Sequence, residues 1–225
     1  MKIIDVTGRI HDGMWSYGFP FPDYKMSALP QPEWVETKVY CEIFEGLNSQ
    51  TGTYLETPAH LLGYEKSYPL SEIPVEKLYE MPAIILNIEC EECEKRPPIT
   101  EAMLEAAAKT VDMSDVRRSA LIVSTGWGRH WDSGDYLDKA PYFTLGAMRW
   151  LIDRKPFILA SDTPRWENLD EPQGFFPEFY AADILMLAPL VNTENASKTN
   201  ALLTVLPMAV DGSCCVPCRA LLIER

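Results

Sequence analysis

The sequence predicts a protein of the α/β class, because strand-like and helix-like segments alternate along its 225 residues. Mostly apolar runs of strand length recur at residues 83–88, 120–125 and 184–187. Between them, residues 144–153 place apolar side chains at helical spacing. A chain of this length in which 47% of the residues are hydrophobic can bury one full core, so we assign residues 1–225 to a single domain.

The first fifth of the chain is predicted to be strand and loop. Residues 2–6 form the first expected strand, and the loop over 15–22 is too rich in proline for a helix or a central strand. Apolar and polar positions then alternate over residues 37–43, which predicts a half-buried strand. Cys41 falls within that alternation, and we expect it to be a small core residue.

The remaining elements follow in order along the chain. Residues 71–78 predict a short helical turn, and Thr100 is the expected N-cap of a helix with an acidic residue in its first turn. Residues 157–160 predict another buried strand. The last two strand-like runs, 201–208 and 219–223, flank a turn containing Asp, Gly and Ser, which is typical of a hairpin.

Charge and hydropathy exclude several classes of partner. The net charge of −13 would repel phosphate, so we expect neither nucleic acid nor an anionic membrane as a partner. The N-terminus lacks the layout of a signal peptide, and no apolar run reaches the length of a membrane span. These features predict a cytoplasmic protein.

The six cysteines allow two interpretations. Cys90 and Cys93, together with the Cys214, Cys215 and Cys218 group, would form a structural zinc site if the two segments met in space. The segments lie far apart in the sequence, however, and cysteines of a reducing compartment are often incidental.

Residues 50–60 read Gln-Thr-Gly-Thr-Tyr-Leu-Glu-Thr-Pro-Ala-His. This stretch resembles the His-x-Gly-Thr-His-x-Asp-x-Pro-x-His signature of the cyclase/kynurenine formamidase-like metal-dependent hydrolases. Four residues match that pattern: Gly52, Thr53, Pro58 and His60. At the other positions, where the family holds a divalent metal, the chain has Gln50, Tyr54 and Glu56. The resemblance therefore implies an inherited fold with a degenerate metal motif.

Further blocks resemble the same family in the same order: residues 4–7, 12–14, 124–131, 159–164, 193–195, 206–212 and 216–219. Glu194 stands where the family has a late glutamate, and Ala181-Ala182-Asp183 stands where it has a histidine. The resemblance implies a swivelling β/β/α fold, with a central barrel-like mixed sheet and peripheral helices. It also implies a homodimer or homotetramer.

The residues at the motif predict that no zinc or manganese is bound as a cofactor. Imidazole is a strong ligand for these ions, whereas an amide oxygen and a phenol are weak ones. An oxygen-only set from Gln50, Glu56 and Glu194 stays open as an alternative for Mg²⁺ or Ca²⁺.

Without a metal, acid–base chemistry would rest on His60 together with Glu56 or Glu194. Two carboxylates that faced each other would raise the pKa of one of them. We expect Tyr54 to donate a hydrogen bond to a developing oxyanion. The substrate-binding residues are expected to be Gln50, Tyr54 and two aromatics of the proline-rich loop, Trp15 and Tyr17.

The family resemblance implies an enzyme, a hydrolase that acts on a small carbonyl compound such as an amide, a lactam or an ester. Two alternatives stay open. One is an isomerase, dehydratase or cyclase that uses His60 and the carboxylates. The other is a non-catalytic member that binds a small ligand.

Overall fold

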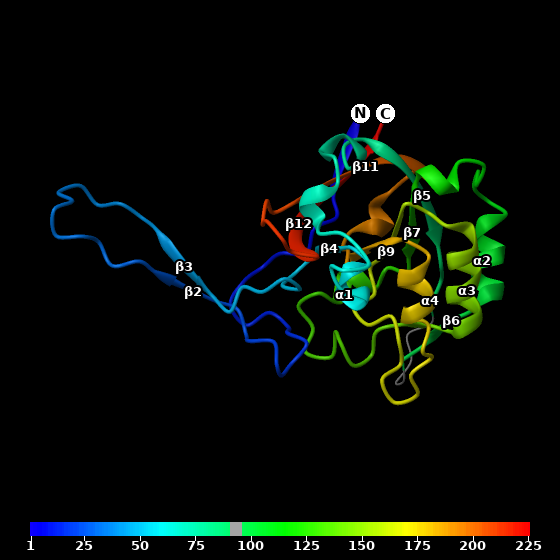
Figure 1. The fold of residues 1–225 in the computed structure, drawn as a ribbon, viewed down its shortest axis with the longest axis horizontal. Coiled ribbons are helices and arrows are strands. Elements are labelled where there is room, and N and C mark those ends of the chain that lie inside the picture. Colours follow the sequence, from blue (N-terminus) through cyan, green and yellow to red (C-terminus); the bar gives the residue numbers. More distant parts are fainter. Residues whose placement is uncertain (91–95) are drawn as a thin grey trace.

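The computed structural model describes residues 1–90 and 96–225. Its central feature is a mixed sheet (Figure 1). The strand order of this sheet is β1-β12-β11-β5-β7-β9-β10-β4. The strands are β1 (Lys2–Asp5), β4 (Tyr54–Glu56), β5 (Met81–Asn87), β7 (Ala120–Ser124), β9 (Ile158–Ser161), β10 (Leu185–Ala188), β11 (Asn200–Pro207) and β12 (Cys215–Glu224). Because β4 also pairs with β12, seven strands close into a ring and β1 lies outside it. The predicted α/β class with a barrel-like sheet is confirmed.

The parallel strands β5, β7, β9 and β10 form the middle of the sheet. Parallel neighbours require crossover connections, and these carry α2 (Glu101–Ala108), α3 (Leu145–Arg154) and α4 (Phe176–Ala181). The side chains of Thr100 and Thr144 accept hydrogen bonds from the first turns of α2 and α3. Both helices therefore begin where the sequence predicts.

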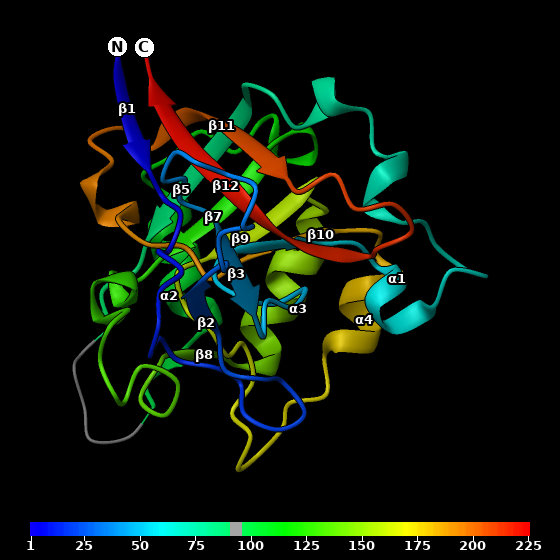
Figure 2. The same ribbon diagram turned by 90° about the vertical axis from the view of Figure 1, so that its left-hand side faces the viewer.

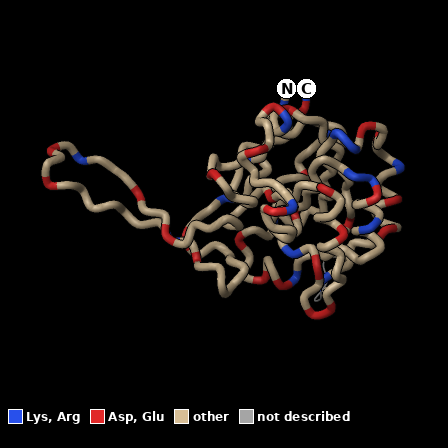
Figure 3. The backbone as a smooth tube through the Cα atoms, in the orientation of Figure 1, with Lys and Arg blue, Asp and Glu red and all other residues tan. Residues whose placement is uncertain are grey.

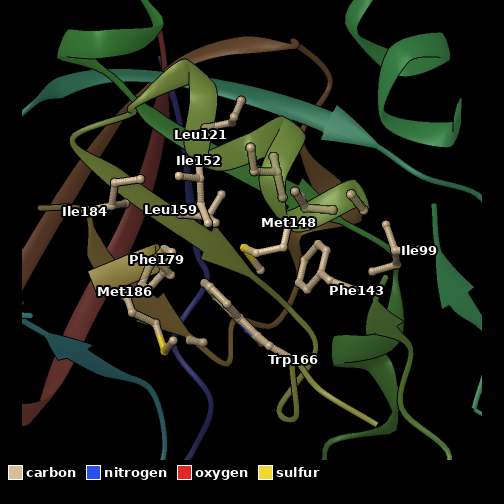
Figure 4. Close-up of a cluster of buried hydrophobic side chains, with 14 of the residues drawn as sticks. Ile99, Leu121, Phe143, Met148, Ile152, Leu159, Trp166, Phe179, Ile184 and Met186 are labelled. Carbon is tan, nitrogen blue, oxygen red and sulfur yellow. The ribbon is translucent and has the colours of Figure 1, made fainter. Parts of the chain in front are cut away.

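Two apolar cores lie on the two faces of the sheet. Side chains such as Leu121, Leu159 and Phe179 pack between the sheet and the helices, together with Met148 of α3 (Figure 4). Their neighbours in sequence, such as Ile122, point to the opposite face, as alternation along a strand requires. This second core receives side chains from all seven strands of the ring, so it fills the ring's interior.

Smaller elements complete the body. They are the parallel pair β6 (Pro98–Ile99) and β8 (Tyr142–Phe143), the helix α1 (Ala59–Leu62), and 3₁₀ turns at Leu70–Glu72, Val75–Lys77, Val116–Arg118, Trp127–His130 and Thr193–Asn195. The first two 3₁₀ turns correspond to the helical turn predicted over 71–78. No helix in the described part of the chain is long and apolar enough to cross a membrane.

A hairpin over residues 25–45, called the arm here, projects away from the body (Figures 1 and 2). Its strands β2 (Lys25–Ala28) and β3 (Glu42–Glu45) pair antiparallel, and every residue in them is exposed. The half-buried strand predicted over 37–43 is therefore wrong, and Cys41 is exposed instead of lying in the core. Alternation in a sequence marks an apolar side of a strand, but it does not specify which other element covers that side.

Candidate functional site

A pocket of about 380 Å³ contains most of the residues that the motif singled out. Five residues predicted from the sequence line it: Tyr17, Gln50, Tyr54, Glu56 and His60. Aromatic side chains contribute much of the remaining wall: Phe21, Trp166, Phe176 and Tyr180. A mostly apolar cavity with a few convergent polar groups is the usual form of a small-molecule site.

The retained motif residues hold the backbone in place. Gly52 has φ +73°, and a Cβ atom there would lie 2.8 Å from Cγ1 of Ile10. The Thr53 hydroxyl donates to the carbonyl oxygen of Pro189 at 2.6 Å and accepts from the backbone N–H of Gly8 at 2.9 Å. These tasks require no metal, which explains how the scaffold of the motif persists while its ligand positions differ.

Glu56 is the buried charge at the base of the pocket, with 1% of its surface exposed. Its carboxylate accepts hydrogen bonds from Nε2 of Gln50 at 3.2 Å and from the hydroxyl of Tyr180. Burial raises the pKa of Glu56, and the nearby His60 and these two donors oppose that rise.

His60 is held against this carboxylate by the turn into α1. Its Nδ1 lies 3.3 Å from Oε2 of Glu56. A carboxylate at that contact favours the neutral tautomer that carries its hydrogen on Nδ1, which leaves Nε2 free to accept a proton. The side chain is 40% exposed, so a small molecule in the pocket can reach the ring. Glu56 and His60 thus form a carboxylate–imidazole pair suited to general acid–base chemistry.

The hydroxyl groups of Tyr17 and Tyr54, two further residues of the pocket wall, are joined by a hydrogen bond. The Tyr17 hydroxyl donates to the carbonyl oxygen of Pro164 at 2.9 Å, which uses its single proton. The Tyr17 and Tyr54 hydroxyls lie 3.2 Å apart, so Tyr54 must be the donor in that bond. Tyr54 therefore has no second proton for an oxyanion. Gln50, which donates only one of its two amide hydrogens to Glu56, is the better candidate.

A half-buried arginine, Arg96, fixes the wall that carries Pro164 and Trp166. The guanidinium of Arg96 donates to the carbonyl oxygens of Arg165 and Glu167, each at 2.6 Å, and to that of Ala140 at 2.7 Å. Burial lowers the pKa of Arg96 to about 10, which leaves it charged at neutral pH. The backbone of the wall is thus held by one side chain.

Two residues predicted for the site lie elsewhere. Glu194 is exposed on the 3₁₀ turn Thr193–Asn195, whereas its neighbour Thr193 is buried and donates to Asp162 at 3.2 Å. The structure therefore does not bring Glu194 to Glu56. Trp15 packs edge-on against Tyr17 with ring centroids 5.2 Å apart, so it stands behind the pocket wall.

The sequence analysis did not single out Tyr180 or Cys215, both of which adjoin Glu56. Tyr180 directly precedes the Ala181-Ala182-Asp183 block, where the family resemblance places a histidine, and that position was the available signal. Cys215 on β12 pairs with Glu56 on β4. Burial raises the pKa of the Cys215 thiol well above its usual range, so it stays neutral.

The side chains at the pocket do not fit a zinc or manganese ion. They offer Glu56, one imidazole whose Nδ1 already faces that carboxylate, an amide and three phenols. The second carboxylate in the lining, Glu167, accepts hydrogen bonds from the backbone N–H groups of Gly174 and Phe175. Among the described residues, no group of three or more His, Cys, Asp or Glu side chains is arranged to hold a metal. Cys93, which the four-cysteine zinc interpretation requires, lies outside the described residues.

The ring of strands, the motif backbone and the aromatic pocket define a cyclase-like α/β protein with a carboxylate–histidine pair at its site. Residues 4–168 match the model of the family described as "Putative cyclase", and the chain belongs to that family. Comparison with curated protein sequences gives no match.

Solved structures with the same fold include hydrolases. An isatin hydrolase bound to the product analogue thioisatinate has a TM-score of 0.79 at 16% identity, covering 99% of this chain and 92% of its own. Isatin hydrolase A from Labrenzia aggregata, bound to benzyl benzoate, has a TM-score of 0.75 at 18% identity, covering 99% and 93%. A predicted metal-dependent hydrolase from Bacillus stearothermophilus has a TM-score of 0.74 at 18% identity, covering 100% and 98%. At these identities the likeness shows the fold alone.

Proposed function

We propose that this protein is a hydrolase that cleaves a C–N or C–O bond in a small carbonyl compound, an amide, a lactam or an ester, without a transition metal. The observation that carries the proposal is the 3.3 Å contact between His60 Nδ1 and Glu56 Oε2 inside the pocket. Family membership and the fold of the structural neighbours support a hydrolase-like activity.

In the proposed reaction, a water molecule hydrogen-bonded to Nε2 of His60 attacks the substrate carbonyl carbon. Nε2 takes a proton from the water, and the buried Glu56 carboxylate stabilises the imidazolium that forms. The free amide hydrogen of Gln50 stabilises the developing oxyanion. When the tetrahedral intermediate collapses, Nε2 returns the proton to the departing nitrogen or oxygen.

The walls favour a flat, aromatic substrate. Rings of Phe21, Trp166 and Phe176 border a volume of about 380 Å³, which is at the small end of the range for small-molecule sites. Isatin, an aromatic lactam, is therefore a suitable first probe, and the named activity of two structural neighbours supports its choice.

The second candidate is a non-catalytic protein that binds a small ligand in the same pocket. It is favoured by the donors around Glu56, because hydrogen bonds from Gln50 and Tyr180 hold the carboxylate within the protein. An isomerase, dehydratase or cyclase would use the same base to move a substrate proton instead of activating water.

The test is a hydrolysis screen of isatin and small aromatic amides and esters, with binding of each compound measured by calorimetry. We expect turnover by the wild type and a loss of roughly 10²- to 10⁴-fold in His60→Gln. His11→Gln is the matched control, because His11 pairs with Asp132 outside the pocket. Binding of a compound without turnover would favour the non-catalytic alternative, and full activity of His60→Gln would exclude the proposed mechanism.

A further inference from the structure

We propose that Arg165 makes the pocket selective for ligands that carry a carboxylate, and that its guanidinium exchanges an ion pair with Asp138 for one with that group. The inference deepens the proposed function by naming a second feature of the substrate, and it rests on that function for the position of the reacting carbonyl beside His60. A substrate of this class is a small aromatic amide, lactam or ester with an anionic substituent away from the bond that is cleaved.

The first observation is the set of charged groups in the pocket lining. Four lining residues can carry a charge near neutral pH: Glu56, His60, Arg165 and Glu167. Glu56 and His60 face each other, and Glu167 accepts hydrogen bonds from two backbone N–H groups. Arg165 differs from these three, because its partner Asp138 does not line the pocket. The guanidinium therefore supplies a permanent positive charge whose partner lies outside the lining.

The second observation is the weakness of that ion pair. Nη1 of Arg165 lies 3.2 Å from Oδ1 of Asp138, and among the described residues this is the one hydrogen bond of the guanidinium. The Asp138 side chain is 77% exposed, whereas that of Arg165 is 22% exposed. Water screens a pair with so exposed a partner, so the pair adds little stability and is readily exchanged. A guanidinium has five N–H donors, and most of them are thus left for a ligand.

The third observation is the firm support of Arg165 in the wall. Its carbonyl oxygen accepts from the guanidinium of Arg96 at 2.6 Å, and the carbonyl oxygen of Pro164 accepts from the Tyr17 hydroxyl at 2.9 Å. These two hydrogen bonds fix the backbone from which the side chain extends. Burial raises the pKa of Tyr17, and the charge of Arg165 is one of the groups that oppose that rise, so this charge acts on the pocket wall.

The same contacts order the two ends of the site. The Tyr17 hydroxyl, which contacts the residue before Arg165, is hydrogen-bonded to Tyr54, and Tyr54 lies two residues before Glu56 on β4. Along this chain of contacts the two phenols separate Arg165 from the carboxylate–imidazole pair. A ligand that reaches both ends can place its carbonyl at the imidazole and its anionic group at Arg165, away from the negative charge of Glu56.

The overall charge of the molecule makes a local cation necessary for any anionic ligand. The chain has a net charge of −13, and acidic residues are spread over the body and the arm (Figure 3). Such a surface repels an anion, so binding requires a positive side chain at short distance, which Arg165 supplies in the pocket. One guanidinium matches one carboxylate in charge and in its two-point geometry. A phosphate dianion would leave a net negative charge at the site.

The test is the binding of matched ligand pairs, measured by calorimetry in the His60→Gln background so that turnover contributes no heat. The probes are isatin, benzamide and phenyl acetate, each compared with its derivatives that carry a ring carboxylate. We expect at least one carboxylate to bind more tightly than its neutral parent. In Arg165→Gln this preference, the ratio of the two dissociation constants, should fall by roughly 10- to 100-fold. Arg165→Lys keeps the charge but not the two-point geometry, so an intermediate loss is expected.

Three further variants serve as comparisons, each checked for folding by circular dichroism. Arg149→Gln is the matched control, because it removes an exposed arginine that is paired with Glu178 outside the pocket. Asp138→Asn frees the guanidinium and should raise the preference for the carboxylate by roughly two- to five-fold, the worth of an exposed ion pair. Asp170→Asn removes another exposed negative charge from the segment that follows Arg165 without freeing its guanidinium, so it should raise the preference less.

A panel in which no carboxylate binds more tightly than its neutral parent would overturn the proposal. An undiminished preference in Arg165→Gln, or an equal loss in Arg149→Gln, would overturn the role of Arg165. Equal gains in Asp138→Asn and Asp170→Asn would overturn the exchange of partners. Each of these results is a binding measurement. Arg165-dependent binding without turnover in the hydrolysis screen would therefore count against the proposed reaction and leave this inference in place.

Discussion

Replacing Glu56 by Gln is expected to change the hydrogen bonds around His60 and thereby remove the basic nitrogen of the pocket. The amide oxygen can still accept from Tyr180, but the amide nitrogen then faces Nδ1 of His60 and the amide of Gln50. An N–H in that position forces His60 to accept at Nδ1, so its hydrogen moves to Nε2. The basic nitrogen of the pocket is lost. We expect kcat/KM to fall by roughly 10²- to 10⁴-fold while the pocket keeps its shape.

The same change is expected to alter how the stability of the fold depends on pH. Burial raises the pKa of Glu56 above its ordinary value of 4.5, so the native state holds this proton more tightly than the unfolded chain does. Between the unfolded and the folded pKa, wild-type stability therefore falls as the pH rises. A glutamine does not ionise, so the stability of Glu56→Gln relative to the wild type should increase through that window and then level off.

The assay combines urea unfolding at several pH values with initial rates on the substrate identified by the screen. Glu178→Gln is the control, because Arg149 holds the pKa of the exposed Glu178 below its usual range. The stability of Glu178→Gln relative to the wild type should therefore fall, not rise, as the pH increases. A Glu56→Gln variant with near-wild-type kcat/KM would refute the assignment of Glu56 as the group that orients His60. A variant whose relative stability decreased with rising pH would refute the raised pKa.

Four further predictions follow from the geometry. Tyr54→Phe should cost about 1 kcal/mol of stability by urea unfolding and leave kcat within a few-fold, because Tyr54 donates its only proton to Tyr17. Gln50→Leu should lower kcat at least 10-fold. A larger loss of kcat in Tyr54→Phe than in Gln50→Leu would contradict the proton assignment. Arg96→Lys should lower the free energy of unfolding by about 2–4 kcal/mol and raise KM more than it lowers kcat, since lysine cannot span the three carbonyl groups. An unchanged KM would argue against the role of Arg96 in fixing the wall. Gly52→Ala should cost about 1–2 kcal/mol of stability in thermal or urea unfolding, because φ is positive at Gly52 and a Cβ there would approach Ile10. Gly134→Ala is the control, since a Cβ at Gly134 meets open space, and an equal cost there would remove that explanation. Elemental analysis of the purified protein should find no stoichiometric zinc or manganese; a metal that is lost in Glu56→Gln would show that the donor set was misjudged.

The sequence predicted the body of the protein well because local and global signals agree there. Buried strands such as 120–125 are covered on both faces, so their apolar runs are unambiguous. Thr100 caps its helix through a local hydrogen bond, which depends on nothing distant. The arm was mispredicted because the exposure of residues 37–43 depends on the absence of a covering layer, and a residue pattern carries no information on that.

The site was predictable where it is local in sequence. Glu56 and His60 lie four residues apart on one turn, so the motif itself brings them together. The resemblance also pointed to Glu194, but successive side chains of a 3₁₀ turn point in different directions, and here the turn buries Thr193 and exposes Glu194. The contact of Tyr180 with Glu56 joins residues 124 positions apart, on α4 and β4, and it forms only in the folded protein.

The closing of the ring has a consequence for the order in which the molecule folds. β4 has three residues, and its pairing partners are β10 and β12, so Glu56 is matched with Met186 and Cys215 from the far end of the chain. Contacts between residues so distant in sequence form late, because the entropy of closing the long intervening loop opposes them. We therefore expect the pocket to be assembled late, when β4 closes the ring. Hydrogen exchange during refolding should show protection of the amides of residues 54–56 after those of β5 and β7, and the pocket should gain its ligand affinity in that same late phase.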